Sequence, residues 1–156
     1  MWIENQIFKE DLEYINNVNF VDWKKLENKT VLVTGGTGLI GYYFINALLF
    51  RNLTMQSNIT VVALVRNLNK AKDMYKKQLE IDCNMRFVVG DVEELPGIEE
   101  QIDFVMHGAS PTASNFFVEY PVETIKTAVQ GTINMLELAK KKKVQGFVYL
   151  SSMEVY

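Results

Sequence analysis

The stretch TGGTGLIG at residues 34–41 lies between a short β-branched run, TVLVT at residues 30–34, and a longer apolar segment at residues 39–53. The first run is largely apolar and predicts a buried strand, whereas the later segment has its apolar residues at helical spacing. A glycine-rich loop that joins a strand to a helix is typical of a phosphate-binding turn. Its place in the chain is therefore more informative than the glycine spacing alone.

Each glycine of this loop has its own role in such a turn. Gly35 permits the tight turn, Gly38 lets the backbone approach a pyrophosphate, and Gly41 lets the helix pack closely on the strand. The N–H groups that open the helix are unpaired and carry partial positive charge, which attracts phosphate. The alternative is that the glycines serve turn geometry alone. The residues expected to contact a dinucleotide are Gly35, Thr37, Gly38, Leu39, Ile40 and Gly41.

Short apolar runs alternate with helical segments along the rest of the chain. Such strands, separated by helices, indicate a parallel sheet with helices on both faces. We expect an α/β Rossmann-type sheet with strand order 3-2-1-4-5, numbered along the chain. Further strands are expected at residues 59–65, 85–89, 102–106 and 147–150, and helices at residues 39–53, 68–79 and 121–143. The last helix has an apolar face that includes Ile125, Val129, Ile133, Leu136 and Leu138.

The N-terminal residues form a separate element in this pattern. Apolar residues near helical spacing predict a short amphipathic helix that packs on the domain, namely Ile7, Phe8, Leu12 and Ile15. We therefore divide the chain into an N-terminal helical extension, residues 1–28, and a dinucleotide-binding Rossmann domain, residues 29–156.

The composition excludes several classes of protein. Of the 156 residues, 48% are hydrophobic and 22% are charged, which is ordinary for a globular domain. The formal net charge of -3 argues against a nucleic-acid binder. No run approaches the roughly 20 apolar residues of a membrane-spanning helix, and the first residues lack the basic start of a signal peptide. Cys83 is the only cysteine, so neither a disulfide framework nor a metal site is expected, and a cytoplasmic setting fits best.

The end of the second expected strand bears on the choice of cofactor. Dinucleotide folds often place an acid there to bind the adenosine 2′-hydroxyl, but this chain has Val65-Arg66-Asn67. The Arg66 guanidinium can bind a 2′-phosphate through two hydrogen bonds, which favours NADP. Alternatively, Arg66 stacks on the adenine or lies in solvent, so both NAD and NADP stay open.

Four motifs in order resemble the extended short-chain dehydrogenase/reductases, and more narrowly the NAD-dependent epimerase/dehydratase group that acts on nucleotide sugars. The resemblance runs from about Lys29 to the last residue. The motifs are the loop at residues 34–41, Gly90-Asp91-Val92, His107-Gly108-Ala109-Ser110, and Ser151-Ser152-Met153-Glu154-Val155-Tyr156.

The resemblance implies roles for residues in these motifs. Asp91 and Val92 contact the adenine, and Ser152 hydrogen-bonds the reacting oxygen of the substrate. The short loop that lines the cofactor after the fourth strand consists of Gly108, Ala109 and Ser110. From the residues alone, Asp91 is alternatively a turn cap, and His107 is better explained as a core histidine with satisfied hydrogen bonds than as a catalytic one.

The activity implied for the intact protein is epimerisation or dehydration of a nucleotide sugar. The nicotinamide takes a hydride from the sugar to give a 4-keto intermediate, and the hydride is later returned. The resemblance also implies a nucleotide-sugar partner and a homodimer. Two alternatives remain: an NADP-dependent carbonyl reductase of the same superfamily, and a non-catalytic dinucleotide-binding sensor.

The chain departs from the family pattern at two places. The chemistry needs a Tyr-x-x-x-Lys pair, in which the lysine lowers the pKa of the tyrosine, and no tyrosine here has a lysine four residues on. We therefore expect this chain to end before the acid/base pair, the last strands and the substrate lobe, to bind dinucleotide weakly at best, and to be inactive alone. Ala128 stands where the family commonly has asparagine.

Overall fold

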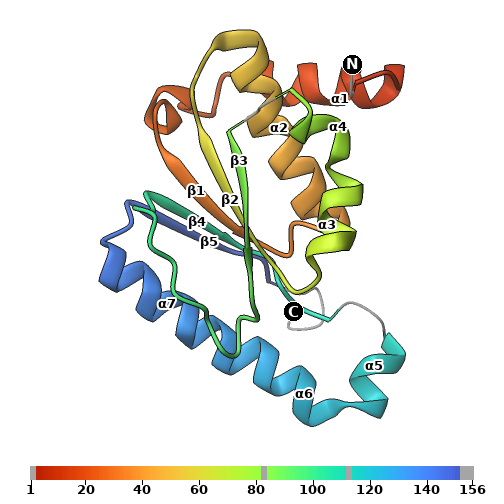
Figure 1. Cartoon of the computed structure of the whole chain (residues 1–156), viewed down its shortest axis with the longest axis vertical. Helices are drawn as coiled ribbons and strands as arrows, with labels where there is room; N and C mark the ends of the chain where they lie inside the picture. The colour runs from red at the N-terminus through yellow and green to blue at the C-terminus, as the bar shows by residue number, and fades with distance from the viewer. Residues whose placement is uncertain (1–2, 82–83, 112–113, 152–156) are drawn as a thin grey trace.

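A computed structural model describes residues 3–81, 84–111 and 114–151. Its centre is one sheet of five parallel strands in the order β3-β2-β1-β4-β5, which confirms the predicted order (Figure 1). The strands are β1 (Thr30–Thr34), β2 (Thr60–Val65), β3 (Met85–Val89), β4 (Phe104–His107) and β5 (Gly146–Tyr149). Thr34 pairs with Leu64 of β2 and His107 of β4, so the carboxyl ends of the three central strands meet at one edge.

Helices cover both faces of the sheet, and side chains alternate between two cores along each strand. Val31 and Val33 pack beneath α2 (Leu39–Met55), whereas Leu32 points to the opposite core, with Met135 of α7 (Gly131–Lys142). The helices α3 (Leu68–Met74) and α4 (Lys76–Leu79) lie on the same side as α2 (Figure 1).

The segment predicted as one helix over residues 121–143 is interrupted. It consists of α6 (Pro121–Ile125), a π-helical turn η2 (Lys126–Gln130) and α7. The hydroxyl of Thr132 donates to the carbonyl of Ala128 at 2.6 Å, and such side-chain bonds compete with the regular backbone ladder. The segment is preceded by a short helix, α5 (Ser114–Glu119).

The apolar face expected on this helix does not face the sheet. Gly131, Met135 and Ala139 are the buried residues of α7; Met135 packs in the core with Leu32, and Leu138 is partly buried beside it. A stripe on another side of the helix is exposed instead, and it consists of Val122, Ile125, Val129, Ile133 and Leu136.

The N-terminal segment forms a helix as predicted, α1 (Gln6–Asn17), followed by a 3-10 turn η1 (Trp23–Leu26). Asn5 caps α1 by accepting from the amide of Phe8 at 3.0 Å. Leu12 is fully buried in the core beneath α2, whereas Ile7 is 70% exposed, so only part of the predicted apolar face packs. No helix in the described part of the chain is long and apolar enough to cross a membrane.

Candidate functional site

The glycine loop has the geometry that its sequence predicts. Gly35 has a φ of 74°, a left-handed conformation, and a Cβ there would collide with the carbonyl of Gly108. A Cβ on Gly41 would collide with the carbonyl of Gly35, so the first turn of α2 lies too close to the loop backbone for any side chain. Gly38 differs, because a Cβ there meets only the Gly35 carbonyl, at 3.3 Å. The bare backbone of Gly38 therefore borders open space.

That space is a groove of about 570 Å³ at the carboxyl ends of the strands. Its volume and position match those of small-molecule sites in open α/β sheets. The sequence-predicted residues that line the groove are Gly35, Thr37, Gly38, Arg66, Asp91, Val92, Gly108, Ala109 and Ser110. Leu39 and Ile40 are not among the lining residues, and their side chains are 76% and 61% exposed. Gly41 serves packing instead.

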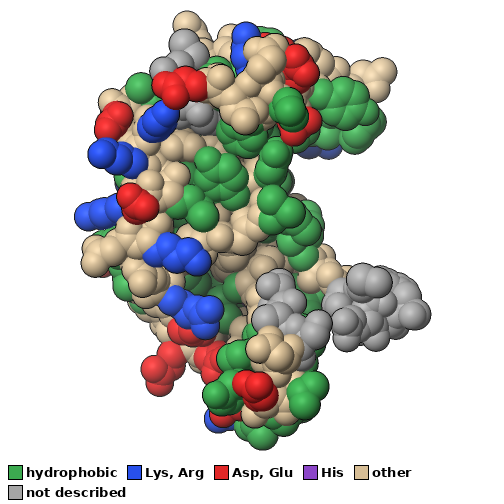
Figure 2. Space-filling view, turned by 90° about the vertical axis from the view of Figure 1, so that its right-hand side faces the viewer, with side chains coloured by type: hydrophobic (Ala, Val, Ile, Leu, Met, Phe, Trp, Pro, Cys, Tyr) green, Lys and Arg blue, Asp and Glu red, His purple; other side chains and the backbone are tan. Residues whose placement is uncertain are grey.

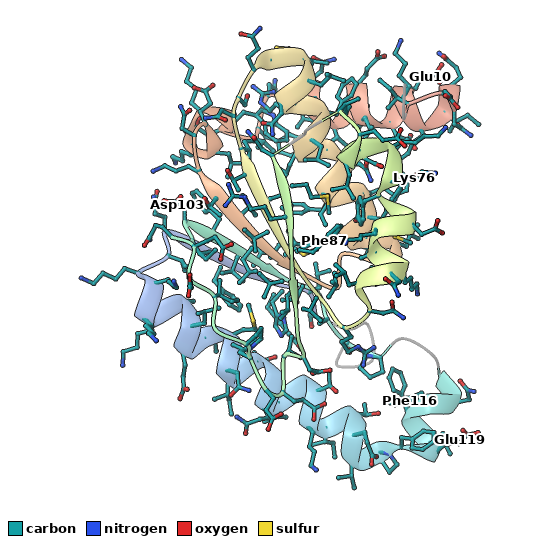
Figure 3. The ribbon with its side chains drawn as sticks, in the orientation of Figure 1. Glu10, Lys76, Phe87, Asp103, Phe116 and Glu119 are labelled. Atoms are coloured by element: carbon teal, nitrogen blue, oxygen red, sulfur yellow. The ribbon has the colours of Figure 1, made fainter. Side chains whose placement is uncertain are left out.

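Several lining residues were missed by the sequence reasoning, and those with polar or aromatic side chains are Glu93, Phe116, Glu123 and Thr127. Phe116 lies on α5, and Thr127 lies on the π-helical turn, so this side of the groove comes from the irregular segment after β4 (Figure 3). The hydroxyl of Thr127 donates to Glu93 at 2.5 Å. A π-helical turn inside a helix often marks a functional site, but nothing in the local sequence pattern signalled one.

Helix α7 fixes the loop after β3, which holds Asp91 and Val92. The side-chain amide of Asn134 donates to the carbonyls of Val92 and Glu93, at 2.9 and 2.8 Å. A Cβ on Gly131 would lie 2.7 Å from the Val92 side chain, so only glycine permits this approach. The loop after β3 is therefore positioned by a residue of α7 that is 41 and 42 positions away from its two partners in the sequence.

The threonine that ends β1 organises the loop after β4. Its hydroxyl oxygen accepts from the amides of Gly108 and Ala109, at 3.2 and 3.1 Å, and lies 2.7 Å from Nδ1 of His107. Because the two amides occupy the acceptor positions of Thr34, its hydroxyl proton is left to donate to His107 Nδ1.

That bond determines the state of His107. The imidazole carries its proton on Nε2, which donates to the hydroxyl of Thr132 at 3.3 Å. The Thr132 hydroxyl in turn donates to the carbonyl of Ala128. Burial lowers the pKa of His107, and the side chain is 1% exposed. His107 is thus a neutral core histidine, as the residue pattern favoured.

Charge in the groove is predominantly acidic. Asp91, Glu93 and Glu123 contribute carboxylates, whereas Arg66 is the one cation among the described lining residues. The Arg66 guanidinium lies 3.9 Å from Asp91 and its side chain is 82% exposed. Such an exposed pair is weak, so Arg66 is free to bind an anion at the end of β2.

Comparison with known protein families agrees with this geometry. The model of the NAD dependent epimerase/dehydratase family matches residues 31–156, which run from β1 through every part of the groove. The chain belongs to this family.

Individual members of the epimerase/dehydratase family align over most of this chain. UDP-glucuronic acid decarboxylase 2 of Arabidopsis thaliana is 32% identical over 153 residues, which are 95% of this chain and 32% of that protein. UDP-glucose 4-epimerase of Rickettsia felis is 32% identical over 131 residues, 80% of this chain and 37% of that protein. The chain thus spans about a third of the length of these curated relatives.

Solved structures of the family agree in fold. A UDP-glucose-4-epimerase from Stenotrophomonas maltophila, crystallised with NAD and formylated UDP-arabinopyranose, has a TM-score of 0.65 and 27% identity. The likeness covers 82% of this chain and 38% of that chain. Of the motifs that this chain shares with the family, residues 152–156, including Ser152, lie outside the described part of the structure.

Proposed function

We propose that this chain is the dinucleotide-binding part of an NAD(P)-dependent enzyme that epimerises or dehydrates a nucleotide sugar. The observation that carries the proposal is the groove at the carboxyl ends of the strands, bordered by the left-handed Gly35 and the bare backbone of Gly38. Two of the relatives, a UDP-glucuronic acid decarboxylase and a UDP-glucose 4-epimerase, support the substrate class. Residues 29–156 form the binding domain in this proposal, with residues 1–28 as a packing extension.

In this proposal the chain's own residues bind and orient the cofactor. The amides of the glycine loop and the dipole of the 17-residue helix α2 attract the diphosphate. Asp91 and Val92 contact the adenine, and Gly108, Ala109 and Ser110 close the opposite wall. When bound, the dinucleotide supplies hydride transfer. Ser152 hydrogen-bonds the reacting oxygen of the sugar.

A second candidate function is favoured by Arg66. The end of β2 has a guanidinium where a carboxylate commonly binds the adenosine 2′-hydroxyl of NAD. NADP therefore fits this position, as in an NADP-dependent carbonyl reductase of the same superfamily. Relative affinity for the two dinucleotides separates the candidates.

Nuclear magnetic resonance titration of the 156-residue chain with NAD and with NADP tests the proposal, since weak binding still displaces amide signals. We expect shifts at residues 35–38, 91–92 and 108–110. If neither dinucleotide causes shifts, or if the shifts are confined to other surfaces, the proposal is contradicted.

An activity assay is a separate test. Mixed with UDP-glucose and dinucleotide, this chain alone is expected to give no product, because it has no Tyr-x-x-x-Lys pair.

We further propose that the protein is a homodimer in the cytoplasm. The exposed apolar stripe on α6 and α7 supports the dimer, because contiguous apolar surface of this kind marks an association site. Its residues recur every three or four positions and are 43% to 62% exposed, namely Val122, Ile125, Val129, Ile133 and Leu136. Hydrophobic side chains also reach the surface of the neighbouring lower lobe, formed by α5 and α6 (Figure 2). A single cysteine supports a reducing compartment.

A further inference from the structure

A buried tyrosine supports the glycine loop from behind. Tyr75 lies at the junction of α3 and α4, where the predicted helix over residues 68–79 is interrupted. Its side chain is fully buried, and its hydroxyl donates to the carbonyl of Gly36 at 2.5 Å. The two residues are 39 positions apart in the sequence, so the bond connects the loop to a different helix.

The surroundings hold this hydroxyl in one position. The ring of Tyr75 lies between Tyr42 and Phe87, with ring centroids 5.3 and 6.0 Å away. Phe87 projects from β3 into the space beneath the helices (Figure 3). Burial raises the pKa of Tyr75, so the side chain stays a protonated hydrogen-bond donor at physiological pH.

The direction of the Gly36 carbonyl determines the direction of the next amide. A trans peptide unit is planar, and its C=O and N–H point to opposite sides. Because Tyr75 draws the Gly36 carbonyl into the protein, the N–H of Thr37 points the other way. Thr37 lines the groove, so its N–H is directed toward the space between the loop and the opposite wall.

The loop cannot easily adjust by moving inward. A Cβ on Gly36 would lie 2.7 Å from the end of the Ile45 side chain, so the backbone is already in close contact with α2. The tyrosine hydroxyl and the packing on Ile45 thus define the orientation of this peptide unit together.

We infer that Tyr75 is a positioning residue for dinucleotide binding, which directs the Thr37 amide at the diphosphate through the Gly36 carbonyl. This inference rests on the proposed function, because it assumes that the groove takes a dinucleotide. Sequence reasoning singled out the loop but gave no role to Tyr75.

The test is the substitution Tyr75→Phe, which removes only the hydroxyl. The matched control is Ile59→Val, which trims a fully buried side chain just before β2, at the opposite end of the sheet from the groove. Both variants are titrated with NAD and with adenosine while amide signals are recorded. Thermal unfolding identifies any variant that is not folded.

We expect Tyr75→Phe to bind NAD about tenfold more weakly and to lose most of the NAD-induced shift at Thr37, while the shifts of Asp91 and Val92 with adenosine persist. Ile59→Val should bind NAD within twofold of wild type. If Tyr75→Phe is unfolded, Phe87→Leu provides the same test, because it keeps the hydroxyl but loosens the ring. That variant should weaken NAD binding by a smaller factor, with a correspondingly smaller loss of the NAD-induced shift at Thr37.

The outcomes distinguish the inference from the function on which it rests. Wild-type protein that shows no NAD-induced shifts contradicts the proposed function itself. The role of Tyr75 alone is overturned if the wild-type protein binds NAD and a folded Tyr75→Phe or Phe87→Leu variant binds it with the same affinity and shows the same Thr37 shift. The inference is also overturned if Ile59→Val weakens NAD binding as much as Tyr75→Phe does, because the loss of affinity then reflects a general loss of stability.

Discussion

The hydroxyl of Thr34 at the end of β1 and the Nδ1 atom of His107 at the end of β4 lie 2.7 Å apart, and both side chains are buried. This contact couples the strand that precedes the glycine loop to the loop after β4, because the same Thr34 oxygen accepts from the amides of Gly108 and Ala109. The two walls of the groove are therefore connected beneath its floor.

Protonation of His107 should destabilise the fold. Its pKa is lowered from the ordinary value of 6.5 by burial, so the folded state binds fewer protons than the unfolded chain in this range. Stability is then fully present above about pH 6.5 and declines as the pH falls, by at most about 1.4 kcal/mol per pH unit for one proton. A protonated Nδ1 also removes the acceptor of the Thr34 hydroxyl.

Urea unfolding between pH 5.5 and 7.5 measures this effect. His107 is the only histidine, so His107→Asn, which keeps an acceptor near Thr34, should flatten the pH dependence in this window. If the variant keeps the wild-type slope, the proton is taken up elsewhere and the assignment is wrong.

Substitution of Gly35 by alanine should damage the fold and the groove together. A left-handed φ costs a non-glycine residue about 1–2 kcal/mol, and the new Cβ also collides with the Gly108 carbonyl. We expect a loss of at least about 2 kcal/mol in the free energy of unfolding. Gly97→Ala is the control, because a Cβ there has no heavy atom within 4 Å. Similar unfolding midpoints for the two variants in urea would exclude a special role for the left-handed turn.

The main features of the fold could be predicted from sequence because the strands are short apolar runs, and the three central ones, β1, β2 and β4, are almost wholly buried. Residues 30–34 and 85–89 form strands with the predicted limits, since a short apolar run between loop residues has few other solutions. The fourth strand begins two residues later than expected, at Phe104. Ile102 is fully buried, so the sequence pattern includes it in the strand although it does not pair with β1. Local hydrophobicity locates strands well but not their ends.

Periodicity could not show which side of the last helix packs on the sheet. Ile133 and Leu136 are larger and more apolar than Gly131 and Ala139, yet the small residues are the buried ones, and Gly131 permits close contact with Val92 in the loop after β3. Contacts between segments that are distant in the sequence could not be predicted from periodicity either. The bonds of Tyr75 to Gly36 and of Thr34 to His107 join residues 39 and 73 positions apart, and no local pattern encodes them.

Removal of the Arg66 guanidinium should affect NADP selectively. Arg66→Ala is expected to weaken NADP binding about tenfold, the loss of one charge-assisted contact of about 1.4 kcal/mol, and to leave NAD within twofold. Arg86→Ala is the matched control, since Arg86 is exposed on β3 and does not line the groove. Calorimetric or resonance titration of both dinucleotides measures the ratio. An equal effect on NAD and NADP would mean that Arg66 does not contact a 2′-phosphate.

A charge placed in the apolar stripe should separate the proposed dimer. Ile133 is 43% exposed in the middle of the stripe, and burying a glutamate there against a second copy costs its solvation without an opposite charge to compensate. We expect Ile133→Glu to sediment as a monomer at concentrations where wild type is a dimer. Ile7→Glu makes the same change at a side chain that is 70% exposed on α1, which lies at the opposite end of the molecule from α6 and α7 (Figure 1), and should leave the dimer intact. Sedimentation velocity of the three proteins decides the matter. A monomeric wild type refutes the dimer, and an Ile133→Glu variant that stays dimeric places the interface away from α6 and α7. Dissociation by both variants would show that the effect is not specific to the stripe.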